Sequence, residues 1–96
     1  MFDPNSPGLT VGVVGAGTMG RGIAQVCAVA GYKVMMHDSF PGVAQEGFDF
    51  IQKILARSVE KGRISSDAAD ETVARISLVD RLEYMAGCGL VIEAAA

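Results

Sequence analysis

The chain has 96 residues, of which half are apolar and a fifth are charged, and its formal net charge is −3. This length allows at most one small globular domain, and the apolar fraction excludes a disordered chain. The eight scattered Lys and Arg residues give no reason to expect nucleic acid or a membrane as a partner. We expect residues 1–8, which are polar and contain two prolines, to be a flexible leader before a domain at 9–96.

The first half of the chain predicts a strand, a helix and a second strand. Residues 9–14 are a short apolar run, and residues 19–30 carry apolar side chains at the spacing of one helix face. Gly31 then ends that helix, and residues 32–37 form a second strand that leads into Asp38.

The second half predicts a pair of helices followed by two more strands. The expected elements are a helix at 43–61, a helix from 65 or 66 to about 75, a strand at 76–79, a helical turn at 80–86 and a strand at 88–93. The last strand is apolar throughout, as a parallel strand covered on both faces should be. The order predicts an α/β fold, namely a Rossmann-type doubly wound parallel sheet, partial with about four strands, and a helical-hairpin insertion after the second strand.

The turn after the first strand has the form G-x-G-x-x-G, with glycines at Gly15, Gly17 and Gly20. Gly15 lets the chain turn sharply, Gly17 lets a pyrophosphate approach the backbone, and Gly20 lets the helix pack tightly on the sheet. The helix that follows presents unpaired N–H groups to the phosphates. This pattern predicts a dinucleotide-binding loop.

Asp38 follows the second strand, where a carboxylate accepts hydrogen bonds from the adenosine ribose hydroxyls. A carboxylate there repels a 2′-phosphate, and no cation follows it in Ser39, Phe40 or Pro41. NAD is therefore favoured over NADP. FAD stays open as an alternative, because its ADP half is held in the same way.

The cysteines and the single histidine carry no catalytic pattern. Cys27 and Cys88 lack metal or redox spacing, so we expect two reduced thiols in a cytoplasmic protein. His37 is expected to be a strand-end residue and not an acid–base catalyst. No metal site is expected, since no three or four ligands cluster in the sequence.

Three segments together resemble the N-terminal NAD-binding domain of the 3-hydroxyacyl-CoA dehydrogenases. They are the string G-x-G-x-M-G-x-G-I-A-Q at 15–25, the segment Glu60-Lys61-Gly62-Arg63-Ile64, and Leu90-Val91-Ile92-Glu93-Ala94-Ala95 near the end. The resemblance covers nearly all of residues 9–96, and the 3-hydroxybutyryl-CoA or 3-hydroxyadipyl-CoA type is the most similar.

The resemblance implies hydride transfer between the 3-hydroxyl carbon of an acyl-CoA and NAD. It implies that Thr18 and Met19 join the glycine loop at the pyrophosphate, and that Ser39 lies beside Asp38 at the ribose. Ala94 and Ala95 would face the cofactor through their backbone. Lys61 corresponds to a lysine that helps to hold CoA, whereas Ile54 stands where the family has a serine.

The family's catalytic residues lie beyond the fourth strand, so we expect no catalytic residue in this chain. The all-helical C-terminal domain that binds substrate and forms the homodimer also lies beyond it. We therefore expect a fragment of a longer enzyme. Two alternatives remain: a stand-alone nucleotide-binding module without catalysis, and a dehydrogenase of a free hydroxy acid, whose relatives lack the long helical hairpin.

Overall fold

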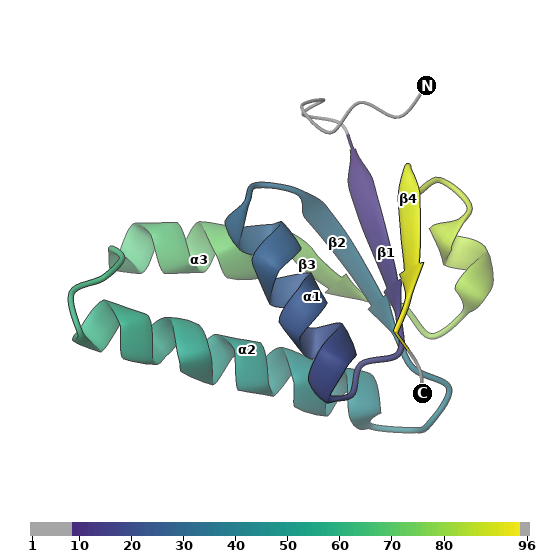
Figure 1. The fold of residues 1–96 in the computed structure, drawn as a ribbon, viewed down its shortest axis with the longest axis horizontal. Helices are drawn as coiled ribbons and strands as arrows, with labels where there is room; N and C mark the ends of the chain where they lie inside the picture. Colours follow the sequence, from purple (N-terminus) through teal and green to yellow (C-terminus); the bar gives the residue numbers. More distant parts are fainter. Residues whose placement is uncertain (1–8, 95–96) are drawn as a thin grey trace.

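The computed structural model describes residues 9–94, which form one sheet with helices on both sides (Figure 1). The leader predicted at 1–8 and the residue Ala95 lie outside the described residues. The elements are β1 (Thr10–Val14), α1 (Thr18–Val29), β2 (Lys33–His37), α2 (Val43–Glu60), α3 (Ser66–Ala74), β3 (Ile76–Leu78), the 3-10 helix η1 (Leu82–Met85) and β4 (Leu90–Glu93). This order confirms the α/β prediction, and most boundaries fall within one or two residues of those expected.

All four strands are parallel and lie in the order β3-β2-β1-β4. The register pairs Val14 with His37 on one side and with Glu93 on the other. The carboxyl ends of β1, β2 and β4 therefore meet at one edge of the sheet. In parallel doubly wound sheets this edge is where ligands bind.

One face of the sheet carries the main core, because α1 and α2 both pack against it. The core contains alternate residues of β1 and β2 together with one side of each helix; its members include Val11, Val13, Val34, Met36, Ala24, Ala28, Ile51 and Leu55. The small residues of α1 allow this helix to lie close to the strands. On the opposite face, η1 contributes the buried side chain of Met85.

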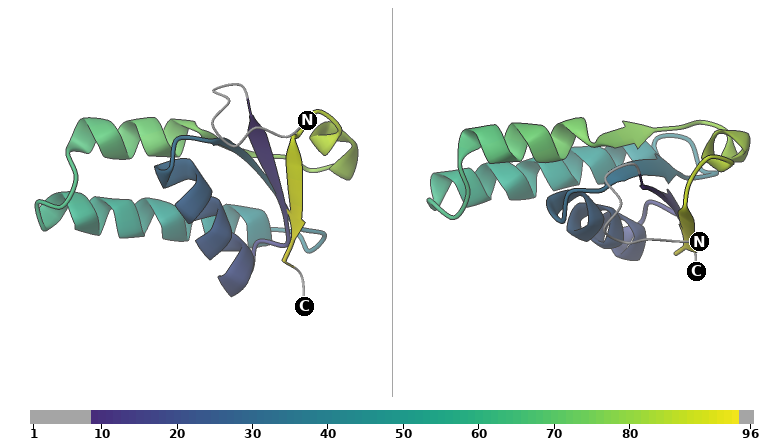
Figure 2. Two further views of the ribbon diagram at one scale, coloured as in Figure 1. Left: turned by 45° about the horizontal axis from the view of Figure 1, so that its top comes forward. Right: turned by 90° about the horizontal axis from the view of Figure 1, so that it is seen from above.

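The helices α2 and α3 form the predicted hairpin, which extends past the sheet on the side of β3 in all views (Figures 1 and 2). Gly62, with a φ of 71°, lies in the turn between them. The Ser65 hydroxyl accepts a hydrogen bond from the backbone N–H of Ala68 at 3.1 Å and caps α3. The sequence leaves the start of this helix open between Ser65 and Ser66, and the structure selects Ser65 as the cap. Ile51 and Leu55 anchor α2 to the core, so its later turns are free to project.

The fourth strand differs from the expectation of a strand covered on both faces. It begins at Leu90 and not at 88, and among the described strands it lies at the sheet edge and pairs with β1 alone. Among the residues described, Leu90 is 40% exposed and Val91 is 48% exposed. An apolar sequence indicates a strand suited to burial, but it does not specify which elements supply the cover.

A glycine in α2 brings this helix against the loop after β1. A Cβ atom on Gly47 would lie 2.9 Å from the carbonyl oxygen of Ala16 and 3.2 Å from Cε of Met36. Neither the backbone oxygen nor the buried core can move away freely. The close approach of α2 to the loop therefore requires the absence of a side chain at position 47.

We expect Gly47→Ala to lower the free energy of unfolding. Overpacking costs about 1–3 kcal/mol, which exceeds the gain of about 0.5–1 kcal/mol from removing a helical glycine. Gly22→Ala in α1 is the matched control, because a Cβ there meets no atom within 4 Å, and it should stabilise the protein. Urea denaturation would measure both, and equal effects of the two substitutions would contradict the assigned contact.

Candidate functional site

A cavity of about 750 Å³ opens at the carboxyl ends of β1, β2 and β4. It brings together most of the residues that the sequence predicts for a cofactor: Gly15, Gly17, Thr18, Met19, Asp38, Ser39 and Ala94. Gly20 lies in the first turn of α1 and does not line the cavity, and Ala95 is outside the described residues. His37, Phe40, Leu82 and Glu93 complete much of the wall.

The glycine loop is held tightly at the start of α1. Gly15 has a φ of 99°, and its N–H donates to the carbonyl oxygen of His37 at 2.7 Å. A Cβ atom on Gly20 would overlap the carbonyl group of Gly15. The first turn of α1 can therefore approach the loop only because position 20 has no side chain, which is the packing role predicted for it.

The N-terminus of α1 is open toward the cavity. Gly17 is the N-cap residue. Within residues 9–94 no side chain caps the helix, and its first turn contains no acidic residue. A Cβ placed on Gly17 would meet no atom within 4 Å, so there is room above the loop. Uncapped N–H groups and the positive end of the helix dipole form a site that suits a phosphate group.

Asp38 has a second role that the sequence motif did not indicate. Its Oδ2 accepts from the backbone N–H of Ala16 at 2.8 Å, and its Oδ1 accepts from the N–H of Phe40 at 2.9 Å. The Ala16 hydrogen bond, followed by the Phe40 bond, lowers the pKa of the Asp38 carboxyl. Each oxygen keeps a lone pair for a ligand hydroxyl, so Asp38 can bind a ribose while it holds the loop.

Five wall residues were missed as site residues, and two of them, Phe40 and His37, have features that bear on the site. Phe40 is 73% exposed and directly follows Ser39, so it offers an aromatic surface beside Asp38. His37 is buried, and its Nδ1 lies 3.0 Å from the carbonyl oxygen of Val79, at the end of β3. An aromatic residue two positions after the strand-end carboxylate was the only available signal for Phe40. The contact between His37 and Val79 joins residues that are far apart in the sequence, so no sequence signal pointed to it.

Arg21 supports the glycine loop from the side of α1. Its Nε donates to the carbonyl oxygen of Ala16 at 3.2 Å, and its guanidinium lies 5.4 Å from the centre of the Phe50 ring. A cation over an aromatic face is attracted by the ring. Arg21 therefore links α1, the loop and α2, and it is not one of the residues that line the cavity.

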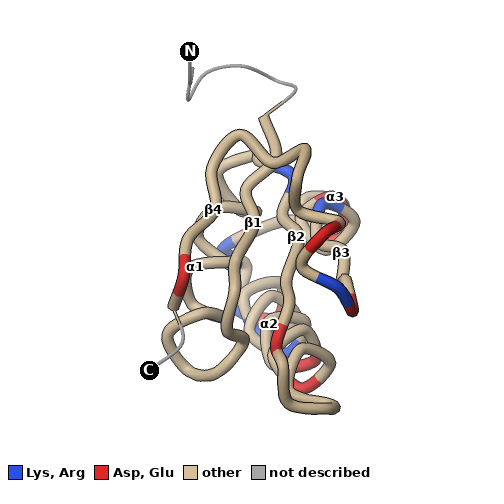
Figure 3. The backbone as a smooth tube through the Cα atoms, turned by 90° about the vertical axis from the view of Figure 1, so that its right-hand side faces the viewer, with Lys and Arg blue, Asp and Glu red and all other residues tan. Residues whose placement is uncertain are grey.

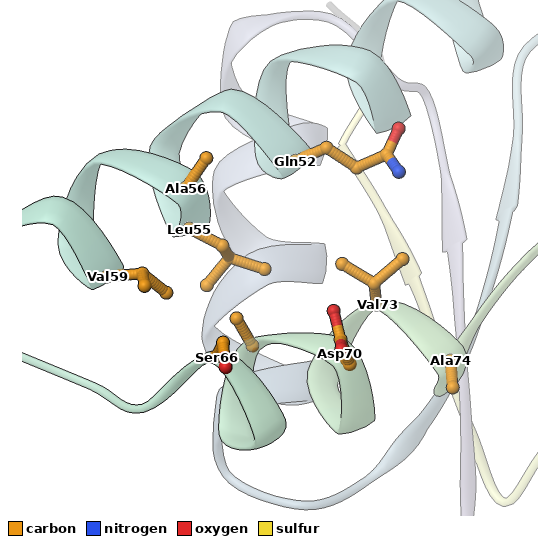
Figure 4. Close-up of a pocket in the computed structure, with 9 residues that line it drawn as sticks. Gln52, Leu55, Ala56, Val59, Ser66, Asp70, Val73 and Ala74 are labelled. Carbon is orange, nitrogen blue, oxygen red and sulfur yellow. The ribbon is translucent and has the colours of Figure 1, made fainter.

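Lys61 lies at the C-terminal end of α2, in the projecting part of the hairpin, and it is exposed. A separate groove of about 550 Å³ runs between α2 and α3, with Leu55, Val59 and Val73 among its walls (Figure 4). Of the predicted site residues that the structure describes, Lys61 included, none lines this groove. The structure thus separates the predicted CoA residue from the cofactor cavity.

Sequence comparison gives the family of this domain. The profile described as 3-hydroxyacyl-CoA dehydrogenase, NAD binding domain, matches residues 10–96. The chain belongs to this family. It is 41% identical over 85 residues to a 3-hydroxybutyryl-CoA dehydrogenase of Bradyrhizobium diazoefficiens, covering 88% of this chain and 29% of the relative. It is 36% identical over 86 residues to the 3-hydroxyadipyl-CoA dehydrogenase of Escherichia coli, covering 90% of this chain and 18% of that protein.

Solved structures of the 3-hydroxyacyl-CoA dehydrogenase family share the fold. The (S)-3-hydroxybutyryl-CoA dehydrogenase of Ralstonia eutropha superposes with a TM-score of 0.86 at 39% identity, over 91% of this chain and 31% of that one. An Escherichia coli 3-hydroxybutyryl-CoA dehydrogenase gives 0.88 at 35% identity, over 92% and 19%. The chain spans less than a third of the length of each of these relatives.

Membership of the 3-hydroxyacyl-CoA dehydrogenase family makes NAD the cofactor of this domain. The residues present fit it, since an open helix N-terminus and a carboxylate lie in one cavity.

Within residues 9–94, no group of three or more His, Cys, Asp or Glu could hold a metal ion. Burial raises the pKa of both free thiols, Cys27 and Cys88. None of the helices described is long and apolar enough to cross a membrane.

We predict that Asp38 makes the stability of the domain depend on pH in acid. Because the folded-state pKa of Asp38 is lowered from 3.8, its stabilisation is complete above that ordinary value and is lost as the pH falls through the lowered one. In Asp38→Asn this part of the acid dependence should disappear. Urea denaturation of both proteins from neutral pH to below 3.8 measures it, and parallel curves would contradict the prediction. Asp49→Asn, an exposed carboxylate on α2, is the control.

Proposed function

We propose that this chain is the NAD-binding part of a longer, NAD-dependent 3-hydroxyacyl-CoA dehydrogenase. One observation carries the proposal: the uncapped N-terminus of α1 and the Asp38 carboxylate line the same cavity, in a chain of that family. The relatives whose names state their activity are 3-hydroxybutyryl-CoA and 3-hydroxyadipyl-CoA dehydrogenases. The activity of the whole protein, its acyl-CoA substrate and a homodimeric state are part of the proposal.

The proposed cofactor contacts follow from the geometry of the cavity. The uncapped backbone N–H groups at the start of α1, at Gly17, Thr18 and Met19, bind the pyrophosphate. Gly15 shapes the loop, since its own N–H is taken by the carbonyl oxygen of His37, and Gly20 lets α1 approach the loop closely. Asp38 accepts hydrogen bonds from the adenosine ribose, with Ser39 beside it.

The remaining walls of the cavity complete the proposed site. The exposed ring of Phe40 provides an apolar surface next to the ribose position, where the adenine would lie. Ala94 lines the cavity after β4, and Ala95 continues that segment. Their backbone would face the half of the cofactor that lies beyond the pyrophosphate.

NAD supplies the hydride acceptor when it is bound. The residues of this domain bind and orient it, and they exclude a 2′-phosphate through the charge of Asp38. We assign no catalytic residue to this chain. Proton transfer from the substrate hydroxyl would be performed by residues elsewhere in the longer protein. We place that protein in the cytoplasm, which agrees with the two free thiols of this chain.

We propose that the hairpin helps to hold the CoA part of the substrate. At about 1.5 Å per residue, the 18-residue α2 reaches roughly 27 Å from the sheet edge to Lys61. Arg57 lies one turn before Lys61 on the same side of the helix. Charges of both signs are interspersed along the hairpin (Figure 3). The proposal therefore rests on these two cations and not on a uniformly basic surface.

NAD should bind this chain more tightly than NADP. NADP would lose the hydrogen bonds between the ribose and Asp38 and would place its 2′-phosphate beside that carboxylate. This should weaken NADP binding by about 1.5–3 kcal/mol, or roughly ten- to a hundredfold in affinity. Calorimetric titration of both cofactors measures the difference. Equal affinities for NAD and NADP would contradict the proposal.

Gly17→Val should abolish the binding of NAD, because the valine side chain would enter the phosphate position. Gly22→Val on α1 should retain the binding of NAD.

Lys61→Glu should raise KM for an acyl-CoA in the full-length dehydrogenase while the affinity for NAD is unchanged. A charged hydrogen bond is worth about 1.5–3 kcal/mol, so KM should rise roughly tenfold or more. Steady-state kinetics with acetoacetyl-CoA and NADH measures it. Lys33→Glu, an exposed lysine at the amino end of β2, is the control. An unchanged KM would assign Lys61 to an ordinary solvated surface.

A further inference from the structure

Three sulfur atoms gather on the sheet face opposite α1 and α2. Sγ of Cys88 lies 3.9 Å from Sδ of Met35. Met35 is paired in register with Gly12 on β1. A Cβ atom on Gly12 would lie 3.0 Å from Sδ of Met85 and 3.2 Å from Sγ of Cys88. The three sulfur atoms therefore surround one small region above the Gly12–Met35 pair.

The sulfur cluster, defined as Met35, Met85 and Cys88, is separate from the cofactor site. Its members come from β2, from η1 and from the segment before β4. Met85 is 4% exposed, and Met35 and Cys88 are half-buried. None of the three lines the cofactor cavity. The missing side chain at Gly12 leaves room for the sulfur atoms to come together.

The chemistry of this cluster suits a soft metal ion. Thiolate ligands bind both Cu(I) and Zn(II). The further ligands of Zn(II) sites are imidazole and carboxylate, so a set of two thioethers and one thiolate favours Cu(I). Two sulfur atoms at a metal–sulfur distance of about 2.3 Å stand about 4 Å apart in a trigonal site, which agrees with the 3.9 Å between Cys88 and Met35. Methionine has three rotatable bonds, so Met85 can adjust to a shared ion.

We propose that Met35, Met85 and Cys88 form a binding site for one Cu(I) ion. On binding, a copper–sulfur bond replaces the S–H bond of Cys88, the proton passes to the buffer, and the copper stays in the Cu(I) state. The two thioethers complete the coordination without losing a proton. The ion would join η1 to the sheet at the Gly12–Met35 pair.

The test is an anaerobic titration of the chain with Cu(I), in competition with a colorimetric Cu(I) chelator such as bicinchoninic acid. We expect one ion per chain, with X-ray absorption showing only sulfur neighbours. Cys88→Ser should lose this binding, while Cys27→Ser, the matched half-buried cysteine on α1, should retain it. Met35→Leu and Met85→Leu should each weaken it by about tenfold or more, since even outer-shell changes cost about 10–100-fold.

The methionine substitutions keep the proposal testable if Cys88→Ser fails to fold, because leucine conserves the volume of methionine. Circular dichroism and NAD titration verify that each variant is folded. Three results would overturn the site: no Cu(I) captured from the chelator, equal loss in Cys27→Ser and Cys88→Ser, or unchanged affinity in both Met→Leu variants. The last result would leave an isolated cysteine as the copper ligand.

Discussion

The hydrogen bond from the Ala16 N–H to the Asp38 carboxylate is the interaction on which the cofactor site depends. It spans 22 positions of sequence and ties the loop after β1 to the end of β2. The parallel register that pairs Val14 with His37 brings these two ends side by side. With the Gly15–His37 backbone bond, it sets the height of the loop above the sheet. The residue that we propose for ribose binding therefore also positions the proposed phosphate site.

Two glycines allow α1 and α2 to pack closely against this loop. Gly20 in α1 lies against the carbonyl of Gly15, and Gly47 in α2 lies against the carbonyl of Ala16. These two contacts hold the loop between α1 and α2 and fix its position relative to both helices. No side chain in the described part of the chain caps the N-terminus of α1, although a cap commonly stabilises a helix by about 1 kcal/mol. We interpret that omission as stability given up to leave the N–H groups free for an anion.

Local patterns in the sequence were sufficient for the elements and for most of the cavity. Period-2 and period-3.6 spacing gave strands and helices close to the observed ones, because each pattern reflects a face that a core must cover. The spacing of Gly15, Gly17 and Gly20 before Asp38 indicated one ligand site, and all but Gly20 line the same cavity. The coverage of β4 was not predictable in this way, since it depends on which elements pack beside Leu90 and Val91.

The sequence by itself determined the order of elements, the glycine loop and the carboxylate that faces it, because these features depend on neighbouring residues and on fixed spacing. Only the tertiary structure decided that Asp38 binds Ala16 and that Gly47 supports the loop. It alone also brought Cys88 to Met35, 53 positions earlier in the chain. These contacts join segments whose separation depends on the twist and register of the sheet, and no local periodicity encodes a distance between them.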